Sequence, residues 1–135
     1  MARVFADAAY FIALLLPNDD LAAAARSANK TLPGIQIVTT DAVLVEYLAH
    51  VSGAGSNLRL LAVRSVEALL VDPDVLVVRQ ELTLFAKALD LYKSRPDKAY
   101  SLTDCMGMVI CREYGITEVL THDHHFEQEG FTILL

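Results

Sequence analysis

Near the start of the chain, the stretch at residues 3–17 reads RVFADAAYFIALLLP. Its first four residues form a short, largely apolar run, Asp7 follows at once, and the next residues have helical composition as far as Pro17. Short apolar runs bounded by polar residues are typical of buried strands, and helices commonly begin just after an acidic residue. We therefore predict a strand, an aspartate and a helix, in that order.

The alternation of strand and helix continues along the chain. Buried strands are predicted at the apolar runs at residues 35–40, 75–78, 118–121 and 131–135. Helices are predicted between them, at residues 19–29, 41–52, 58–70, 81–93, 102–114 and 124–129. Apolar strands alternating with helices are typical of an open parallel sheet covered on both sides by helices. We predict a single α/β domain over residues 1–135, a three-layer α/β/α sandwich with a central parallel sheet of four to five strands.

The composition argues against a membrane protein. Apolar residues make up 54% of the chain, above the usual share of about 45–50%. No stretch approaches the roughly 18 uninterrupted apolar residues that a membrane helix needs. The apolar stretch near the N-terminus lacks the basic cluster and cleavage site of a signal sequence. We expect a cytoplasmic protein with no membrane partner, and the excess of apolar residues predicts a homodimer or a bound partner protein.

Cysteine and charge content narrow the compartment and the partners. Cys105 and Cys111 lie six residues apart in one predicted helix, so their α-carbons would be about 9 Å apart, too far for a disulfide. We expect buried, reduced thiols, as is usual in the cytoplasm. The formal net charge of −6 argues against non-specific binding of nucleic acid. It leaves room for a nucleic-acid substrate approached through metal ions.

Three aspartates each allow a structural and a functional interpretation. Asp7 and Asp123 follow predicted strands, and in parallel sheets ligands bind beyond the carboxyl ends of the strands. Either residue could instead cap the helix that follows it. Asp104 ends the segment SLTD at residues 101–104, which matches a loose capping box. Taken one at a time, these residues leave both interpretations open.

Glu46 lies in a strongly apolar segment, AVLVEYLAHV at residues 42–51. Burying a carboxylate is costly unless it is paired or bound to a metal, so a buried Glu46 would be a candidate metal ligand. The alternative is a glutamate that faces solvent. The predicted fold can bring Glu46 and the three aspartates to one edge of the sheet, where converging carboxylates would repel each other without cations. Hard oxygen ligands of this kind suit Mg²⁺ or Mn²⁺.

The order and spacing of the four acids resemble those of the PIN-domain ribonucleases over essentially the whole chain. The matching segments are VFADAAYFIALL, TTDAVLVEYLAH, YSLTDCMGMVICREYGI and VLTHDHHF. The resemblance implies a PIN-like sandwich and a Mg²⁺ or Mn²⁺ site that is both metal-binding and catalytic, formed by Asp7, Glu46, Asp104 and Asp123. It also implies metal-dependent hydrolysis of RNA with 5′-phosphate and 3′-hydroxyl products. Many relatives are VapC-type toxins paired with an antitoxin protein, and others stand alone.

Several hydroxyl groups are candidates for supporting the acids. By the resemblance, Thr121 would position Asp123 or a metal-bound water. Thr40, Ser101 and Thr103 could hydrogen-bond the carboxylates or the RNA backbone, although helix capping accounts equally well for Thr40 and Ser101. The basic residues available to contact RNA are Arg59, Arg64, Lys93, Arg95, Lys98 and Arg112.

The histidines beside Asp123 lack the cysteine or spaced histidine partners of a structural zinc site. For His122, His124 and His125 we expect solvated loop positions, with a phosphate contact by His122 or His124 as the alternative.

Two rival functions compete with the nuclease interpretation. A phospho-acceptor role for Asp7 would usually need a lysine after a late strand, and none follows Lys98. The other rival is a catalytically silent PIN-like module that binds RNA or protein. The presence of all four acids favours the enzyme.

Overall fold

The computed structural model describes residues 2–135 and contains one sheet of five strands, all paired in parallel. In spatial order the strands are β3 (Val75–Val78), β2 (Gln36–Thr40), β1 (Arg3–Ala6), β4 (Glu118–Leu120) and β5 (Thr132–Ile133). The predicted α/β class with a parallel central sheet is confirmed.

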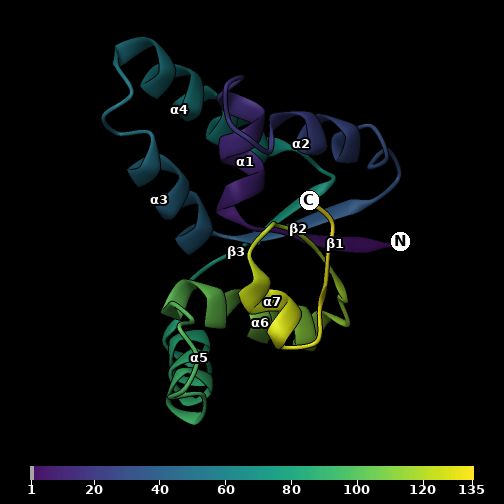
Figure 1. Cartoon of the computed structure of the whole chain (residues 1–135), viewed down its shortest axis with the longest axis vertical. Coiled ribbons are helices and arrows are strands. Elements are labelled where there is room, and N and C mark those ends of the chain that lie inside the picture. Colours follow the sequence, from purple (N-terminus) through teal and green to yellow (C-terminus); the bar gives the residue numbers. More distant parts are fainter. Residues whose placement is uncertain (1) are drawn as a thin grey trace.

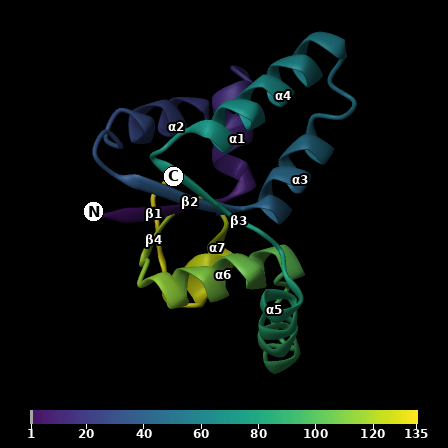
Figure 2. The ribbon, with the colours of Figure 1, turned by 180° about the vertical axis from the view of Figure 1, so that it is seen from behind.

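Helices lie on both faces of this sheet (Figures 1 and 2). One layer consists of α1 (Ala8–Leu15), α2 (Ala22–Asn29), α3 (Asp41–His50) and α4 (Ser56–Val71), and the other of α5 (Leu82–Ser94), α6 (Leu102–Tyr114) and α7 (His124–Gln128). The architecture is therefore the predicted three-layer sandwich. Cys105 and Cys111 on α6 are buried free thiols, as predicted. Within residues 2–135, no helix combines the length and the apolar character needed to cross a membrane.

β1 lies at the centre of the sheet, which explains why the opening stretch of the sequence is so apolar. Phe5 pairs with Val38 on β2 and with Val119 on β4, and all three side chains are buried. A strand with helices over both faces has few solvent-facing positions, so its residues form a nearly continuous apolar run. Asp7 follows this strand directly, and the chain therefore delivers a carboxylate to the middle of the sheet edge.

A close contact between α6 and β1 fixes the helix that carries Asp104. Gly107 in α6 faces the Phe5 ring, and a β-carbon at this position would lie 2.9 Å from ring carbons. Only glycine lets the helix approach so near. Phe126 packs on the same ring, with 6.2 Å between the two ring centroids. Core packing therefore sets the position of Asp104 relative to the strand that ends at Asp7.

Some elements end at residues other than those predicted. β3 and α6 have the predicted bounds. α2 begins at Ala22 rather than at Asp19, because the Asp19 carboxylate accepts a hydrogen bond from the Leu21 N–H and closes a turn before the helix. β4 ends at Leu120, and the next hydroxyl, that of Thr121, takes part in the candidate site instead of the sheet.

Candidate metal centre

Three of the four predicted acids lie at the edge of the sheet where the carboxyl ends of β1 and β4 meet. Asp7 stands between β1 and α1, Asp123 is the N-cap of α7 after β4, and Asp104 lies in the first turn of α6. These residues are far apart in the sequence. The parallel pairing of β1 with β4 brings the first and last of them to one place.

Asp7 is buried and does not act as a helix cap. Its residue is 6% exposed, and its carboxylate makes no capping hydrogen bond to α1 although it occupies the N-cap position. Instead its Oδ2 accepts a hydrogen bond of 3.0 Å from the Thr121 hydroxyl. Burial, and after it the negative charge of Asp104, raises the pKa of Asp7 to about 7. None of the ion pairs formed within residues 2–135 involves Asp7.

Asp104 fulfils the structural interpretation and lies in the acidic cluster as well. The Ser101 hydroxyl accepts a hydrogen bond from the Asp104 N–H, and Asp104 Oδ2 accepts one from the Ser101 N–H, both at 3.0 Å, so the capping box is complete. The residue is 7% exposed, and burial is the main cause that raises the pKa of its carboxyl. The Ser101 N–H opposes this rise and the charge of Asp123 adds to it. The capping box accounts for the hydrogen bonds of Asp104 but not for its closeness to Asp123, which disfavours the charged form of Asp104.

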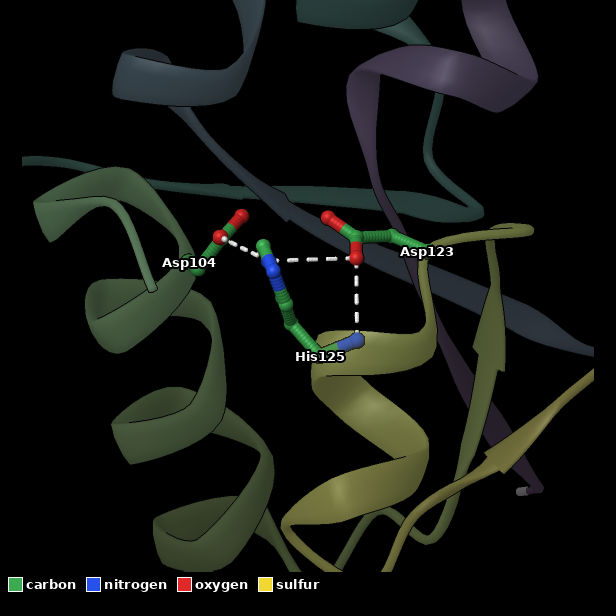
Figure 3. A group of neighbouring side chains, drawn as sticks. All are labelled: Asp104, Asp123 and His125. Atoms are coloured by element: carbon green, nitrogen blue, oxygen red, sulfur yellow. Dashed lines mark hydrogen bonds and ion pairs between the residues drawn. The ribbon is translucent and has the colours of Figure 1, made fainter. Parts of the chain in front are cut away.

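Asp123 and His125 complete a compact group with Asp104 (Figure 3). Asp123 caps α7, since its Oδ1 accepts a hydrogen bond of 2.9 Å from the His125 N–H. The His125 Nδ1 atom lies 3.2 Å from Asp123 Oδ1 and 3.2 Å from Asp104 Oδ2. One ligand atom from each of these residues falls within 4.8 Å of the other two. Two carboxylates and one imidazole therefore converge as a potential metal-binding set.

The three histidines do not share one environment. His122 and His124 are exposed, and their rings bond the Leu135 carbonyl oxygen and the Glu127 carboxylate. For these two the predicted exposure is confirmed. For His125 the expectation of a solvated histidine is wrong, because its side chain is 29% exposed and its ring lies between two carboxylates.

Glu46 lies at the margin of the acidic group. Its side chain is exposed on α3, while Val43, Leu44 and Tyr47 of the same helix are buried. The solvent-facing alternative is therefore the correct one, and a buried Glu46 was the wrong expectation. Partial desolvation raises the pKa of Glu46, and the charges of Asp104 and Asp123 raise it further. Glu46 thus shares the electrostatic environment of the cluster from its solvent side.

Comparison with known proteins identifies the family of this chain. The family model of the PIN domain matches residues 4–131. The chain belongs to the PIN domain family. Among solved structures, this PIN domain is similar to the Mycobacterium tuberculosis toxin VapC20, described as cleaving the sarcin-ricin loop, with a TM-score of 0.85 and 22% identity over 96% of each chain. At that identity the likeness shows the fold. No curated protein matches significantly.

Thr121 connects two acids of the PIN domain. The Thr121 side chain is fully buried, and its hydroxyl donates a hydrogen bond to Asp7 Oδ2. The Thr121 Oγ1 atom in turn accepts a hydrogen bond of 3.0 Å from the Asp123 N–H. One hydroxyl group therefore ties the carboxylate after β1 to the backbone of the turn after β4. This arrangement fixes the spacing of the two strand ends.

The other predicted supporting hydroxyls have local roles. Thr40 is buried and caps α3 by accepting a hydrogen bond from the Val43 N–H, and Ser101 caps α6. Thr103 takes part in none of the side-chain hydrogen bonds formed within the described part of the chain. Sequence reasoning missed Thr39, whose buried hydroxyl donates to the Ala6 carbonyl at 2.8 Å and holds β2 beside the residue before Asp7. The pair of threonines at the end of the second apolar run was the available signal.

Ion pairs of Glu129 hold the C-terminal end of α7. Glu129 has a side chain only 5% exposed and forms ion pairs with Arg95 and Arg112. Burial alone would raise the pKa of Glu129, but hydrogen bonds from the two arginines lower it. Arg112 therefore ties the end of α7 to α6, and Arg95 ties it to the end of α5. These contacts in turn help to keep Asp123 beside Asp104.

Proposed function

We propose that this PIN domain is a divalent-metal-dependent ribonuclease that hydrolyses RNA phosphodiester bonds. The observation that carries the proposal is the convergence of Asp7, Asp104 and Asp123 at the carboxyl edge of the sheet. Two of these acids are buried and have raised pKa values. Buried carboxylates that repel each other are costly unless a cation offsets their charge.

The donor set fits a hard divalent cation. Asp7, Asp104 and Asp123 are the proposed ligands, directly or through water, and Glu46 is the proposed ligand or water-orienting group at the rim. Carboxylate oxygens suit Mg²⁺ and Mn²⁺. When bound, such an ion acidifies water and stabilises the charge that develops on the phosphate.

The chain's own side chains prepare this chemistry. The Thr121 hydroxyl holds one oxygen of Asp7, and the Ser101 N–H holds one oxygen of Asp104, so both carboxylates have fixed orientations. Glu46 is exposed and has a raised pKa. A carboxylate of this kind at the solvent side is suited to accept a proton from an attacking water.

The toxin of a type II toxin–antitoxin pair is the proposed biological setting. The support is the close likeness of fold to VapC20. Large apolar side chains are also exposed on α4, which suits a homodimer or a cognate antitoxin protein as partner; they are Leu60, Leu61, Val63, Leu70 and Val71. A cytoplasmic location follows from such a role, because the proposed substrate is cellular RNA.

The test is RNA cleavage by purified protein in EDTA, Mg²⁺ or Mn²⁺. The substrates are a mixed RNA pool and a sarcin-ricin loop hairpin. Asp104→Asn keeps the size and the capping oxygen of the side chain, and should reduce cleavage by at least about a hundredfold because a metal-binding charge is lost. Asp97→Asn, a change at an exposed loop acid, is the matched control. If wild type and Asp104→Asn are equally inert in each metal although the folded protein binds RNA, a silent binding module replaces the enzyme.

A further inference from the structure

His125 is the one member of the three-residue group in Figure 3 that offers nitrogen rather than oxygen. We propose that His125 is a direct nitrogen ligand of the metal centre, so that the ion is held by carboxylates and an imidazole together. The inference rests on the proposed function, because it requires that a divalent cation binds at Asp104 and Asp123. It goes further by assigning a ligand and a metal preference.

The distances around His125 match those between neighbouring ligands of one ion. Two donors at adjacent corners of an octahedron with bonds of about 2.1 Å are about 3 Å apart. The Nδ1 atom lies 3.2 Å from Asp104 Oδ2 and 3.2 Å from Asp123 Oδ1. The spacing of Nδ1 from each carboxylate oxygen therefore suits neighbouring ligands of one ion. Nδ1 binds a metal through its lone pair in the tautomer that carries the ring proton on Nε2.

The ring of His125 is held in this place by the fold. The backbone N–H of His125 donates a hydrogen bond to the Asp123 carboxylate. The Tyr100 ring lies beside the His125 ring, with 5.5 Å between the two centroids. The next residue, Phe126, is fully buried in the core. Glu129, one turn further along, is clamped by two arginines. A ligand that is positioned before the ion arrives loses little freedom on binding it.

A nitrogen ligand has a consequence for metal choice. Mg²⁺ gives up water reluctantly and is usually bound through one or two carboxylates. Imidazole is a softer ligand and favours transition metals over Mg²⁺. The protein should therefore prefer Mn²⁺ to Mg²⁺, and removal of the imidazole should weaken Mn²⁺ binding more than Mg²⁺ binding.

The experiment measures metal binding directly, without RNA. Pulsed electron paramagnetic resonance of bound Mn²⁺ should show the modulation of a directly coordinated ¹⁴N nucleus in the wild type and in His124→Ala. This signal should be lost in His125→Ala, whose dissociation constant for Mn²⁺ by calorimetry should rise at least about tenfold, since even changes behind a metal ligand commonly cost 10- to 100-fold. His124 is the matched control because its ring is exposed and bonds Glu127.

A second variant guards against misfolding. His125→Asn keeps a short polar side chain near the two carboxylates but removes the ring nitrogen, and circular dichroism verifies its fold. Tight Mn²⁺ binding without a ¹⁴N signal in the wild type, or with the same signal in both His125 variants, would overturn the inference and leave the acidic metal site intact. Absence of Mn²⁺ binding by the wild type would overturn the inference and the proposed function together.

Discussion

Asp7→Asn should stabilise the metal-free protein, and by more as the pH rises. Asp7 is 6% exposed, and burial with the charge of Asp104 raises its pKa from 3.8 to about 7. The folded protein therefore holds a proton on Asp7 more firmly than the unfolded chain does. Stability falls as the pH rises from the unfolded value through the folded one. Above that range, the carboxylate is ionised in both states and its burial disfavours the folded state.

The size of the effect follows from the pKa difference. A rise from 3.8 to about 7 corresponds to roughly 4 kcal/mol at a pH well above 7. At pH 5 the folded carboxyl is mostly protonated, and only roughly 1 to 2 kcal/mol of this cost applies. Asparagine keeps an oxygen that can accept the Thr121 hydrogen bond but does not titrate. The stability difference between Asp7→Asn and wild type should grow by roughly 2 to 3 kcal/mol between pH 5 and pH 8.

Urea unfolding in EDTA at the two pH values measures this difference. Asp20→Asn, a change at an exposed acid, is the control and should show no comparable growth. Adding Mg²⁺ at pH 8 should stabilise the wild type and not Asp7→Asn, because a cation bound to the folded state alone shifts the unfolding equilibrium. If the stability difference between Asp7→Asn and wild type were the same at pH 5 and pH 8, the reasoning would be refuted. Such a result would mean that burial does not raise the pKa of Asp7.

Two further changes test how the site is held. Thr121→Val removes the buried hydroxyl that bonds Asp7 and should lower the free energy of unfolding by about 1 to 3 kcal/mol. Thr121→Ser keeps the hydroxyl and should retain most of the wild-type stability. Equal urea midpoints for the two variants would contradict the bridging role of the hydroxyl. Gly107→Ala should cost about 1 to 3 kcal/mol because the added β-carbon would lie 2.9 Å from the Phe5 ring. Gly53 has open space around it, so Gly53→Ala should change stability by less than about 0.5 kcal/mol. Calorimetry would argue against a tight contact between α6 and β1 if the two glycine variants had equally lowered melting temperatures.

The sheet could be predicted because its physical signal is local. Residues 3–6 and 75–78 are short apolar runs bounded by polar residues or turns, and both became strands. The aspartates after strands could also be predicted, since a parallel sheet collects the carboxyl ends of its strands at one edge. The bounds of α6 followed from a capping box at Ser101 and a left-handed glycine at Gly115.

The exposure of Glu46 could not be read from the residues beside it in the sequence. Its neighbours along the chain are apolar, yet an α-helix turns about 100° per residue. Val43, Leu44 and Tyr47 are buried, whereas Glu46 lies about 100° around the helix from the middle of this group and is exposed. Apolar residues also lie on the exposed side of this helix, at Val45 and Ala49, so the local sequence does not reveal which side faces solvent.

The position of His125 could not be read from the sequence. Its Nδ1 atom contacts Asp104, 21 residues away. That contact depends on the packing of α7 against α6 and on the rotamer of one side chain. Neither quantity leaves a local pattern, and the four adjacent polar residues 122–125 after a strand read equally well as a solvated turn.

The hydrogen bond between Thr121 and Asp7 spans 114 positions of the chain, and this separation orders events during protein synthesis. Ribosomes extend a chain by about 5 to 20 residues per second, and the N-terminal part emerges first. The carboxylate after β1 is therefore made several seconds or more before the strand and turn that complete its surroundings. Until then the central strand lacks its β4 neighbour, and no arrangement of the emerging chain can assemble the acidic group. A growing polypeptide therefore cannot form the acidic group until Thr121 and Asp123 have been made.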